Sequence, residues 1–128
     1  MRLTETAQGN VAIFALEGEI DLHYAPVLRS LFKAKLNART PALVLDLTEV
    51  GYIDSTGLAA IIEYFRDSGE YGGVLCLVGL NKQVKSIFEI VRLDQTIPIF
   101  KTRAEAIEAF QRGELTAASS DLFKRPAA

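Results

Sequence analysis

The sequence predicts an α/β domain built on a mixed β-sheet with about four helices. Apolar runs of strand length alternate with segments of helical period, and a Gly9-Asn10 turn separates the first two runs. Strands separated by single helices run parallel through right-handed crossovers, whereas strands joined by a two-residue turn run antiparallel. We therefore expect an N-terminal antiparallel hairpin strand followed by mainly parallel strands.

The hairpin occupies the first part of the chain. Residues 2–8 mix polar and apolar positions, which suits a strand with one face in water. Glycine in the Gly9-Asn10 turn readily takes the positive φ that such a turn needs. Residues 11–16 form an almost continuous apolar run, which is typical of a strand covered on both faces.

Two helices and a second buried strand are expected next. The first helix begins near residue 24, and its apolar stripe consists of Leu28, Leu31, Phe32 and Leu36. Residues 42–47 then form a mostly apolar run of strand length. The second helix, which Gly69 is expected to end, carries apolar residues at i, i+3, i+4 and i+7, namely Leu58, Ile61, Ile62 and Phe65.

The last third of the domain repeats this alternation. Residues 74–78 are expected to form a third buried strand, and Asn81 can cap the helix that follows. That helix has an apolar stripe of Val84, Ile87, Phe88 and Val91. A short strand near residues 97–100 contains Pro98, which places it at a sheet edge or strand end. Thr102 and Glu105 form a capping box for a final helix.

The chain is expected to form one domain over residues 1–112, followed by a mostly polar and flexible tail at 113–128. Leu122 and Phe123 in the tail are the residues that could dock on another surface. The single cysteine, Cys76, lies in an apolar run and is expected to be a buried small hydrophobe.

Composition excludes several classes of function. A net charge of −2 argues against a large basic surface for nucleic acid. The apolar runs are too short to span a membrane, and the N-terminus lacks the apolar segment of a signal peptide. One cysteine and one histidine cannot make a zinc site, and no phosphate-binding GxxxxGK[ST] loop is present. We expect a soluble, cytoplasmic protein without metal, cofactor or membrane span, and not an enzyme.

Polar residues gather where three loops leave the carboxyl ends of the predicted strands. These loops are residues 18–23, 48–57 and 78–81. Binding sites of parallel sheets form at this edge. The topology therefore predicts a polar rim there, consisting of Glu19, Asp21, Asp54, Ser55, Thr56 and Asn81.

Ser55 has two interpretations that the residues alone leave open. It can be a structural helix cap, or it can be a hydroxyl whose chemical state controls docking. Gly57 is expected to keep the approach to Ser55 open, and Thr56 offers a second hydroxyl that turns partly inward. His23 is the only histidine and lies in a loop, so a hydrolytic triad at Ser55 is not expected.

Three segments resemble a bacterial anti-sigma factor antagonist of the STAS-domain family. They are GEIDLHYAPVLRS from Gly18, LVLDLTEVGYIDSTGLAAII from Leu43 and VLCLVGLNKQVKSIFEI from Val74. The resemblance runs in order from about Arg2 to Gln111, and the D-S-[ST]-G motif is its most specific part. It implies a STAS-like mixed sheet.

The resemblance also implies a function and a site. The unphosphorylated protein would bind an anti-sigma factor that is an ATP-using serine kinase, and a sigma factor would be released. Phosphorylation at Ser55, with Thr56 the less favoured acceptor, would end that binding, and a serine phosphatase would restore it. The implied partner-binding residues are Asp21, His23, Asp54, Ser55, Thr56, Gly57 and Leu58. The alternative is a scaffold STAS subunit of a stressosome-like or lipid-transport assembly, in which Ser55 only marks a docking surface.

Overall fold

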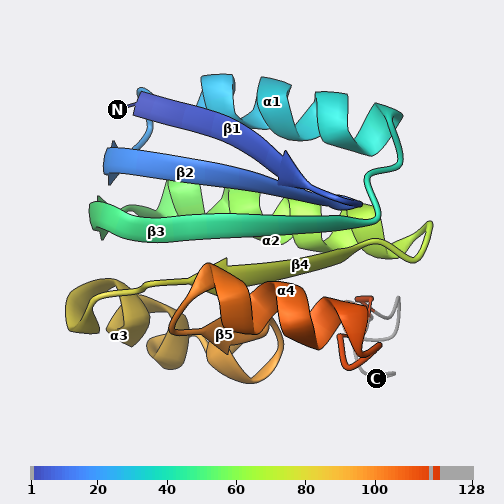
Figure 1. Ribbon diagram of the computed structural model, residues 1–128. Helices are drawn as coiled ribbons and strands as arrows, with labels where there is room; N and C mark the ends of the chain where they lie inside the picture. The colour runs from blue at the N-terminus through green and yellow to red at the C-terminus, as the bar shows by residue number, and fades with distance from the viewer. Residues whose placement is uncertain (1, 116, 119–128) are drawn as a thin grey trace, which may run out of the picture.

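The computed structural model describes residues 2–115, 117 and 118, which form one five-stranded sheet flanked by helices (Figure 1). The strand order is β1-β2-β3-β4-β5. The strands are β1 (Arg2–Gln8), β2 (Val11–Ile20), β3 (Ala42–Ile53), β4 (Val74–Val78) and β5 (Ile99–Phe100). β1 pairs antiparallel with β2, and every other neighbouring pair is parallel. The predicted fold class is confirmed.

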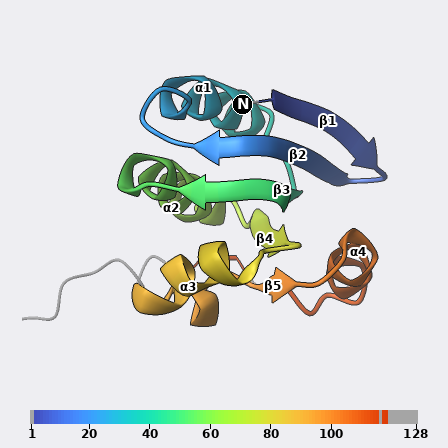
Figure 2. The same cartoon turned by 90° about the vertical axis from the view of Figure 1, so that its left-hand side faces the viewer.

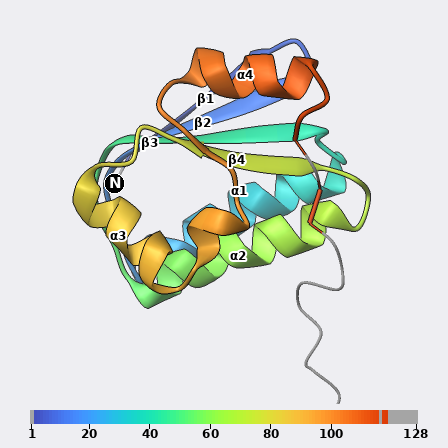
Figure 3. The ribbon, with the colours of Figure 1, turned by 90° about the horizontal axis from the view of Figure 1, so that it is seen from below.

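Helices cover both faces of this sheet. The helices are α1 (Ala25–Asn37), α2 (Ser55–Gly69), α3 (Lys82–Ile90) and α4 (Arg103–Gln111), with a short 3-10 helix η1 (Leu93–Gln95) after α3. Figures 2 and 3 show α1, α2 and α3 on one face and α4 alone on the other. None of the helices in the described part of the chain is long and apolar enough to cross a membrane.

The predicted helix starts at Asn81 and Thr102 are confirmed. Asn81 Oδ1 accepts from the Val84 N–H at 2.8 Å, and its amide group donates to the Val50 carbonyl at 3.1 Å. Thr102 Oγ1 accepts from the Glu105 N–H at 3.2 Å. Such caps satisfy N–H groups that have no partner within the helix. Asn81 therefore serves both as a cap and as a tie between α3 and β3.

Two apolar clusters lie on opposite faces of the sheet. The larger one joins the sheet to α1, α2 and α3 through fully buried side chains that include Phe14, Leu45, Tyr64 and Phe88. The smaller one lies under α4 and contains Cys76, which is 2% exposed. Burial raises the pKa of the Cys76 thiol to about 12, so it stays protonated and unreactive at neutral pH.

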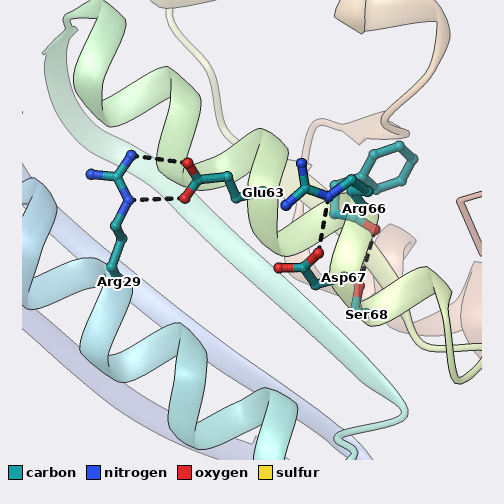
Figure 4. Close-up of polar contacts among 6 residues, drawn as sticks. Arg29, Glu63, Arg66, Asp67 and Ser68 are labelled. Carbon is teal, nitrogen blue, oxygen red and sulfur yellow. Dashed lines mark hydrogen bonds and ion pairs between the residues drawn. The ribbon is translucent and has the colours of Figure 1, made fainter. Parts of the chain in front are cut away.

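Side-chain packing holds α1 against α2. The Phe32 and Tyr64 rings pack against each other with centroids 4.7 Å apart and planes tilted by 32°. At the surface, Arg29 of α1 donates to the Glu63 carboxylate of α2 at 2.9 and 3.2 Å (Figure 4). Both partners of this ion pair are about 40% exposed, so it contributes at most ~1 kcal/mol. Along α2, Arg66 pairs with Asp67 at 3.0 Å.

β2 and β3 are longer than the sequence predicts. β2 continues to Ile20 and β3 to Ile53, so most of the two expected loops is strand. The two strands stay paired over this extension, with register shifts between Ala15 and Glu17 and between Gly18 and Glu19. The expectation of long loops was wrong because these strand ends have a face in water. Only Ile20, Val50 and Ile53 are buried within residues 17–20 and 48–53, so the apolar pattern is broken.

The chain beyond α4 contacts the domain. Gly113 ends the helix with a φ of +70°. Leu115 and Ala117 pack against the cluster under α4, and Ala118 is 8% exposed within the larger cluster. Leu122 and Phe123 lie outside the described residues. For residues 119–128 the expectation of a flexible tail stays a prediction.

Candidate functional site

Asp54 is the only residue between β3 and α2, and it caps the helix. Its N–H donates to the Ile20 carbonyl at 3.0 Å, which extends the pairing of β2 and β3 by one step. Its Oδ1 accepts from the Gly57 N–H at 2.9 Å and from the Thr56 hydroxyl at 2.8 Å. The N-terminus of α2 is therefore fixed to the carboxyl edge of the sheet without an intervening loop.

Because Asp54 is the cap, Ser55 is not needed for that role. Ser55 is the first residue of α2 and is exposed. Among the described residues no side chain or backbone group forms a hydrogen bond with its hydroxyl. The role of structural helix cap, which was one of the two interpretations of Ser55, is thus performed by Asp54. What remains at this position is a free hydroxyl on a rigid helix start.

Asp21 shapes the neighbouring loop between β2 and α1. Its Oδ1 accepts from the His23 N–H at 3.0 Å and from the Tyr24 N–H at 3.1 Å. Its backbone carbonyl accepts from the Ala25 N–H at 2.8 Å and so begins α1. The other oxygen of Asp54, Oδ2, accepts from the Leu22 N–H in this loop at 2.9 Å. One carboxylate therefore ties the Asp21 loop to the start of α2.

The site is acidic. Hydrogen bonds from the Gly57 N–H, the Thr56 hydroxyl and the Leu22 N–H hold the pKa of Asp54 below its ordinary value. An open hollow of about 320 Å³ beside it is lined by Glu19, Asp21, His23 and Tyr24. Asp54 is thus a carboxylate at neutral pH, and a partner that covers this region must match negative charge.

We expect an Asp54→Asn variant to have a flatter dependence of stability on pH. A carboxyl whose folded-state pKa is lowered stabilises the fold above the unfolded-state pKa of about 4. That stabilisation is lost as the pH falls through the lower folded-state pKa. Thermal unfolding between pH 7 and pH 2.5 should show that the wild type loses stability over this range and that the variant loses less. The asparagine side chain can still accept from the Gly57 N–H, and it does not titrate. If stability depended on pH in the same way for the wild type and for Asp54→Asn, the Asp54 carboxylate would not contribute to stability as described.

The remaining predicted site residues differ in exposure. Gly57 is buried, and a Cβ atom there would lie 2.5 Å from the Ile20 carbonyl oxygen. The glycine lets α2 approach β2, a role that the sequence did not indicate, and its expected role in keeping Ser55 accessible stays a prediction. Thr56 is half-buried, as expected, and Leu58 is half-buried against the core. His23 is exposed.

Sequence reasoning missed three apolar side chains at this edge. Leu22 is 61% exposed, Val27 is 50% exposed and Tyr52 is 44% exposed. They come from the Asp21 loop, the first turn of α1 and the end of β3. The available signal was an apolar residue inside a polar stretch, as in Asp21-Leu22-His23. Exposed apolar side chains that come from neighbouring elements at one edge are typical of a protein-docking surface.

The fold and this site define a small α/β domain that carries an exposed serine and exposed apolar side chains at the carboxyl edge of its sheet. The family described as STAS domain matches residues 3–106, so the chain belongs to the STAS-domain family. The relatives and structures that it resembles include anti-sigma factor antagonists.

Three of these similarities are informative. The chain is 31% identical over 105 residues to an anti-sigma-B factor antagonist of Listeria monocytogenes, covering 82% of this chain and 91% of the relative. It is 36% identical over 84 residues to the anti-sigma-B factor antagonist of Bacillus subtilis, covering 66% and 76% of the two chains. A crystal structure of an anti-sigma factor antagonist from Mycobacterium paratuberculosis superposes with a TM-score of 0.79 at 26% identity, covering 86% and 93%.

Proposed function

We propose that this protein is an anti-sigma factor antagonist that changes partners when Ser55 is phosphorylated. The unmodified protein binds an anti-sigma factor that is also an ATP-using serine kinase, and a sigma factor is released for transcription. The kinase phosphorylates Ser55 and the complex dissociates. A serine phosphatase then restores the unmodified form. The protein acts by binding other proteins in the cytoplasm, without nucleic acid, cofactor or catalysis of its own.

The observation that carries this proposal is the free Ser55 hydroxyl. Asp54 provides the cap, so modification of Ser55 removes no hydrogen bond that the fold uses. The hydroxyl lies on an exposed helix start next to the loop that presents Leu22. A kinase that docks on this surface therefore finds its acceptor at the centre of the contact.

A phosphate at Ser55 would add about −1.5 to −2 charges to an acidic edge. The Gly57 N–H at the helix start already donates to Asp54 and is not free to neutralise the phosphate. The added charge would therefore lie beside the Asp54 carboxylate. Within a docked complex, this produces like-charge repulsion and a cost of desolvation. The fold itself need not change.

Thr56 is the poorer acceptor. Its hydroxyl donates to Asp54 Oδ1 at 2.8 Å, and the residue is half-buried. Modification there would break part of the hydrogen-bond network that fixes the start of α2. We therefore assign the switch to Ser55 and not to its neighbour.

A kinase assay tests this assignment. The purified protein is incubated with an anti-sigma factor serine kinase of the host and ATP, and the modified residue is located by mass spectrometry. We expect one phosphate at Ser55 in the wild type and in Thr56→Val, and none in Ser55→Ala. Phosphate at another residue, or stable association with a transporter ATPase without any phosphorylation, would contradict the proposal and favour a scaffold subunit.

A further inference from the structure

One side of α2 joins Ser55, at the start of the helix, to Gly69, at its end. Ser55, Ile62 and Gly69 follow one another at intervals of seven residues, close to two turns of helix, so they lie on the same side. Ala59 and Arg66 lie between them on that side. None of these five residues is buried. We call them the α2 stripe.

The α2 stripe is turned away from the neighbouring helix. α1 packs on another side of α2, where Arg29 pairs with Glu63, whereas Arg66 extends from the stripe (Figures 3 and 4). Ile62 is half-buried and is not among the described side chains that pack against either apolar cluster. Between Gly69 and Ser55 the stripe therefore offers a partly apolar surface.

The C-terminal part of the chain reaches this stripe at Gly69. A Cβ atom on Gly69 would lie 2.5 Å from the Ala118 carbonyl oxygen and 2.8 Å from Ala118 Cβ, so the two residues are in close contact. Ala118 is 8% exposed and belongs to the larger apolar cluster. The ten residues that follow, 119–128, therefore start from a fixed point at one end of the stripe.

These ten residues are long enough to follow the stripe to Ser55. At 1.5 Å per residue, the rise along the helix from Gly69 to Ser55 is about 21 Å. An extended chain covers about 3.3–3.6 Å per residue, so about six residues beyond Ala118 span the same distance. The sixth residue is Lys124. A cationic side chain can therefore come level with Ser55.

The order of residues in this segment matches the order of positions along the stripe. Leu122 and Phe123, its two large apolar residues, come before Lys124 and Arg125. At the same rise per residue, the apolar pair lies beside Ile62 when the basic pair lies beside the start of the helix. Apolar and basic side chains thus each face a position that suits them.

A phosphate at Ser55 would lie at an acidic edge and would attract such a basic pair. The Gly57 N–H already donates to Asp54 Oδ1. Lysine and arginine are absent from the lining of the hollow beside Asp54, which consists of Glu19, Asp21, His23 and Tyr24. The phosphate brings about −1.5 to −2 charges, and its strongest partners are the charge-assisted hydrogen bonds of lysine and arginine.

We propose that residues 119–125 lie along the α2 stripe when Ser55 is phosphorylated, and that Lys124 and Arg125 bind the phosphate. This inference rests on the proposed function, because it requires phosphate at Ser55. Arginine binds a phosphate through two parallel hydrogen bonds, and a neutral serine hydroxyl does not accept such a pair. The basic pair therefore docks on the modified form and leaves the unmodified form open to its partner. The docked segment covers the modified surface and so keeps the kinase from binding again.

A nitroxide label on the full chain tests the proposal. Phosphoserine is placed at position 55 during synthesis, so no kinase is needed, and Ala127→Cys carries the label. Cys76 is 2% exposed and stays unlabelled under native conditions. We expect the phosphate to raise the ratio of docked to free segment by about 10-fold or more. Nuclear magnetic resonance should show this as broadening of the Ala59 and Ile62 amide signals, while the signals of β1 stay sharp.

Charge variants show whether the basic pair is responsible. Lys124→Glu combined with Arg125→Glu should abolish the broadening. The matched control, Lys33→Glu combined with Lys101→Glu, makes the same change of net charge at two exposed positions outside the stripe and should keep it. Equal broadening with and without the phosphate, or broadening that persists in Lys124→Glu/Arg125→Glu, would overturn the inference.

The outcomes separate this inference from the proposed function. If the α2 signals stay sharp in the phosphorylated protein and the kinase still fails to bind it, the inference is wrong and the switch at Ser55 stands. If the signals broaden on phosphorylation but the kinase binds both forms equally, the proposed function fails and the contact is confirmed. If the broadening grows with protein concentration, the segment contacts a second copy of the chain, and the inference is overturned.

Discussion

Ser55→Asp is expected to weaken binding to the kinase by about 100-fold, or ~3 kcal/mol. The added carboxylate is placed next to Asp54 within the proposed docking surface, where desolvation and like-charge repulsion act together. Ser55→Ala removes only a hydroxyl that has no partner among the described residues, so it should bind within a few-fold of the wild type. Calorimetry or surface plasmon resonance with the purified kinase measures both.

Ser30→Asp is a matched control for that experiment. Ser30 is an exposed serine in the middle of α1, away from the carboxyl edge of the sheet. The same change of charge there should leave binding nearly unaltered. Equal losses for Ser30→Asp and Ser55→Asp would show a general effect of net charge and would remove the argument for a local switch.

Gly57→Ala is expected to destabilise the fold by about 2 kcal/mol. Its Cβ atom would lie 2.5 Å from the Ile20 carbonyl oxygen and 2.6 Å from Ile20 Cγ2, so the start of α2 must move away from β2. Alanine has the higher helix propensity by about 1 kcal/mol, so propensity alone predicts the opposite sign. Urea unfolding gives the free energy, and the displaced helix start should also weaken binding of the kinase.

Gly51→Ala separates this clash from the general effect of replacing a glycine. A Cβ atom at Gly51 meets nothing within 4 Å, and the residue is exposed in the same strand that leads into the site. We expect its stability to change by less than ~1 kcal/mol, with alanine the better strand residue. If both variants unfold at the wild-type urea concentration, α2 does not depend on close contact with β2.

Elements with a regular apolar pattern could be predicted closely from the sequence. β4 is buried at every position and runs over the predicted residues 74–78. Asn81 and Thr102 could be identified as helix caps because the cap chemistry is local to a few residues. The ends of β2 and β3 could not be predicted, because Glu19 and Tyr52 pair across strands that are far apart in sequence. Pairing of that kind leaves no local signal.

In the candidate site, too, features set by nearby residues could be predicted and features that depend on distant residues could not. The D-S-T-G segment could be located from its composition and from the resemblance to a known family. The choice of Asp54 over Ser55 as the cap depends on the backbone geometry at the helix start. The bond from the Leu22 N–H to Asp54 joins residues 32 positions apart. The sequence also indicated that Asp21 and Asp54 cap or hydrogen-bond loop backbone, but the tie from Asp54 to the Asp21 loop could not be found from it.

The direct passage from β3 into α2 through one residue has a thermodynamic consequence. Ser55, the proposed phosphate acceptor, lies on backbone that is already ordered, so docking at this point need not restrict a mobile segment. The conformational entropy lost on association is then small and comes mainly from side chains such as Tyr52. Complex formation should consequently show a negative heat-capacity change set by apolar burial alone, without the larger value that accompanies coupled folding.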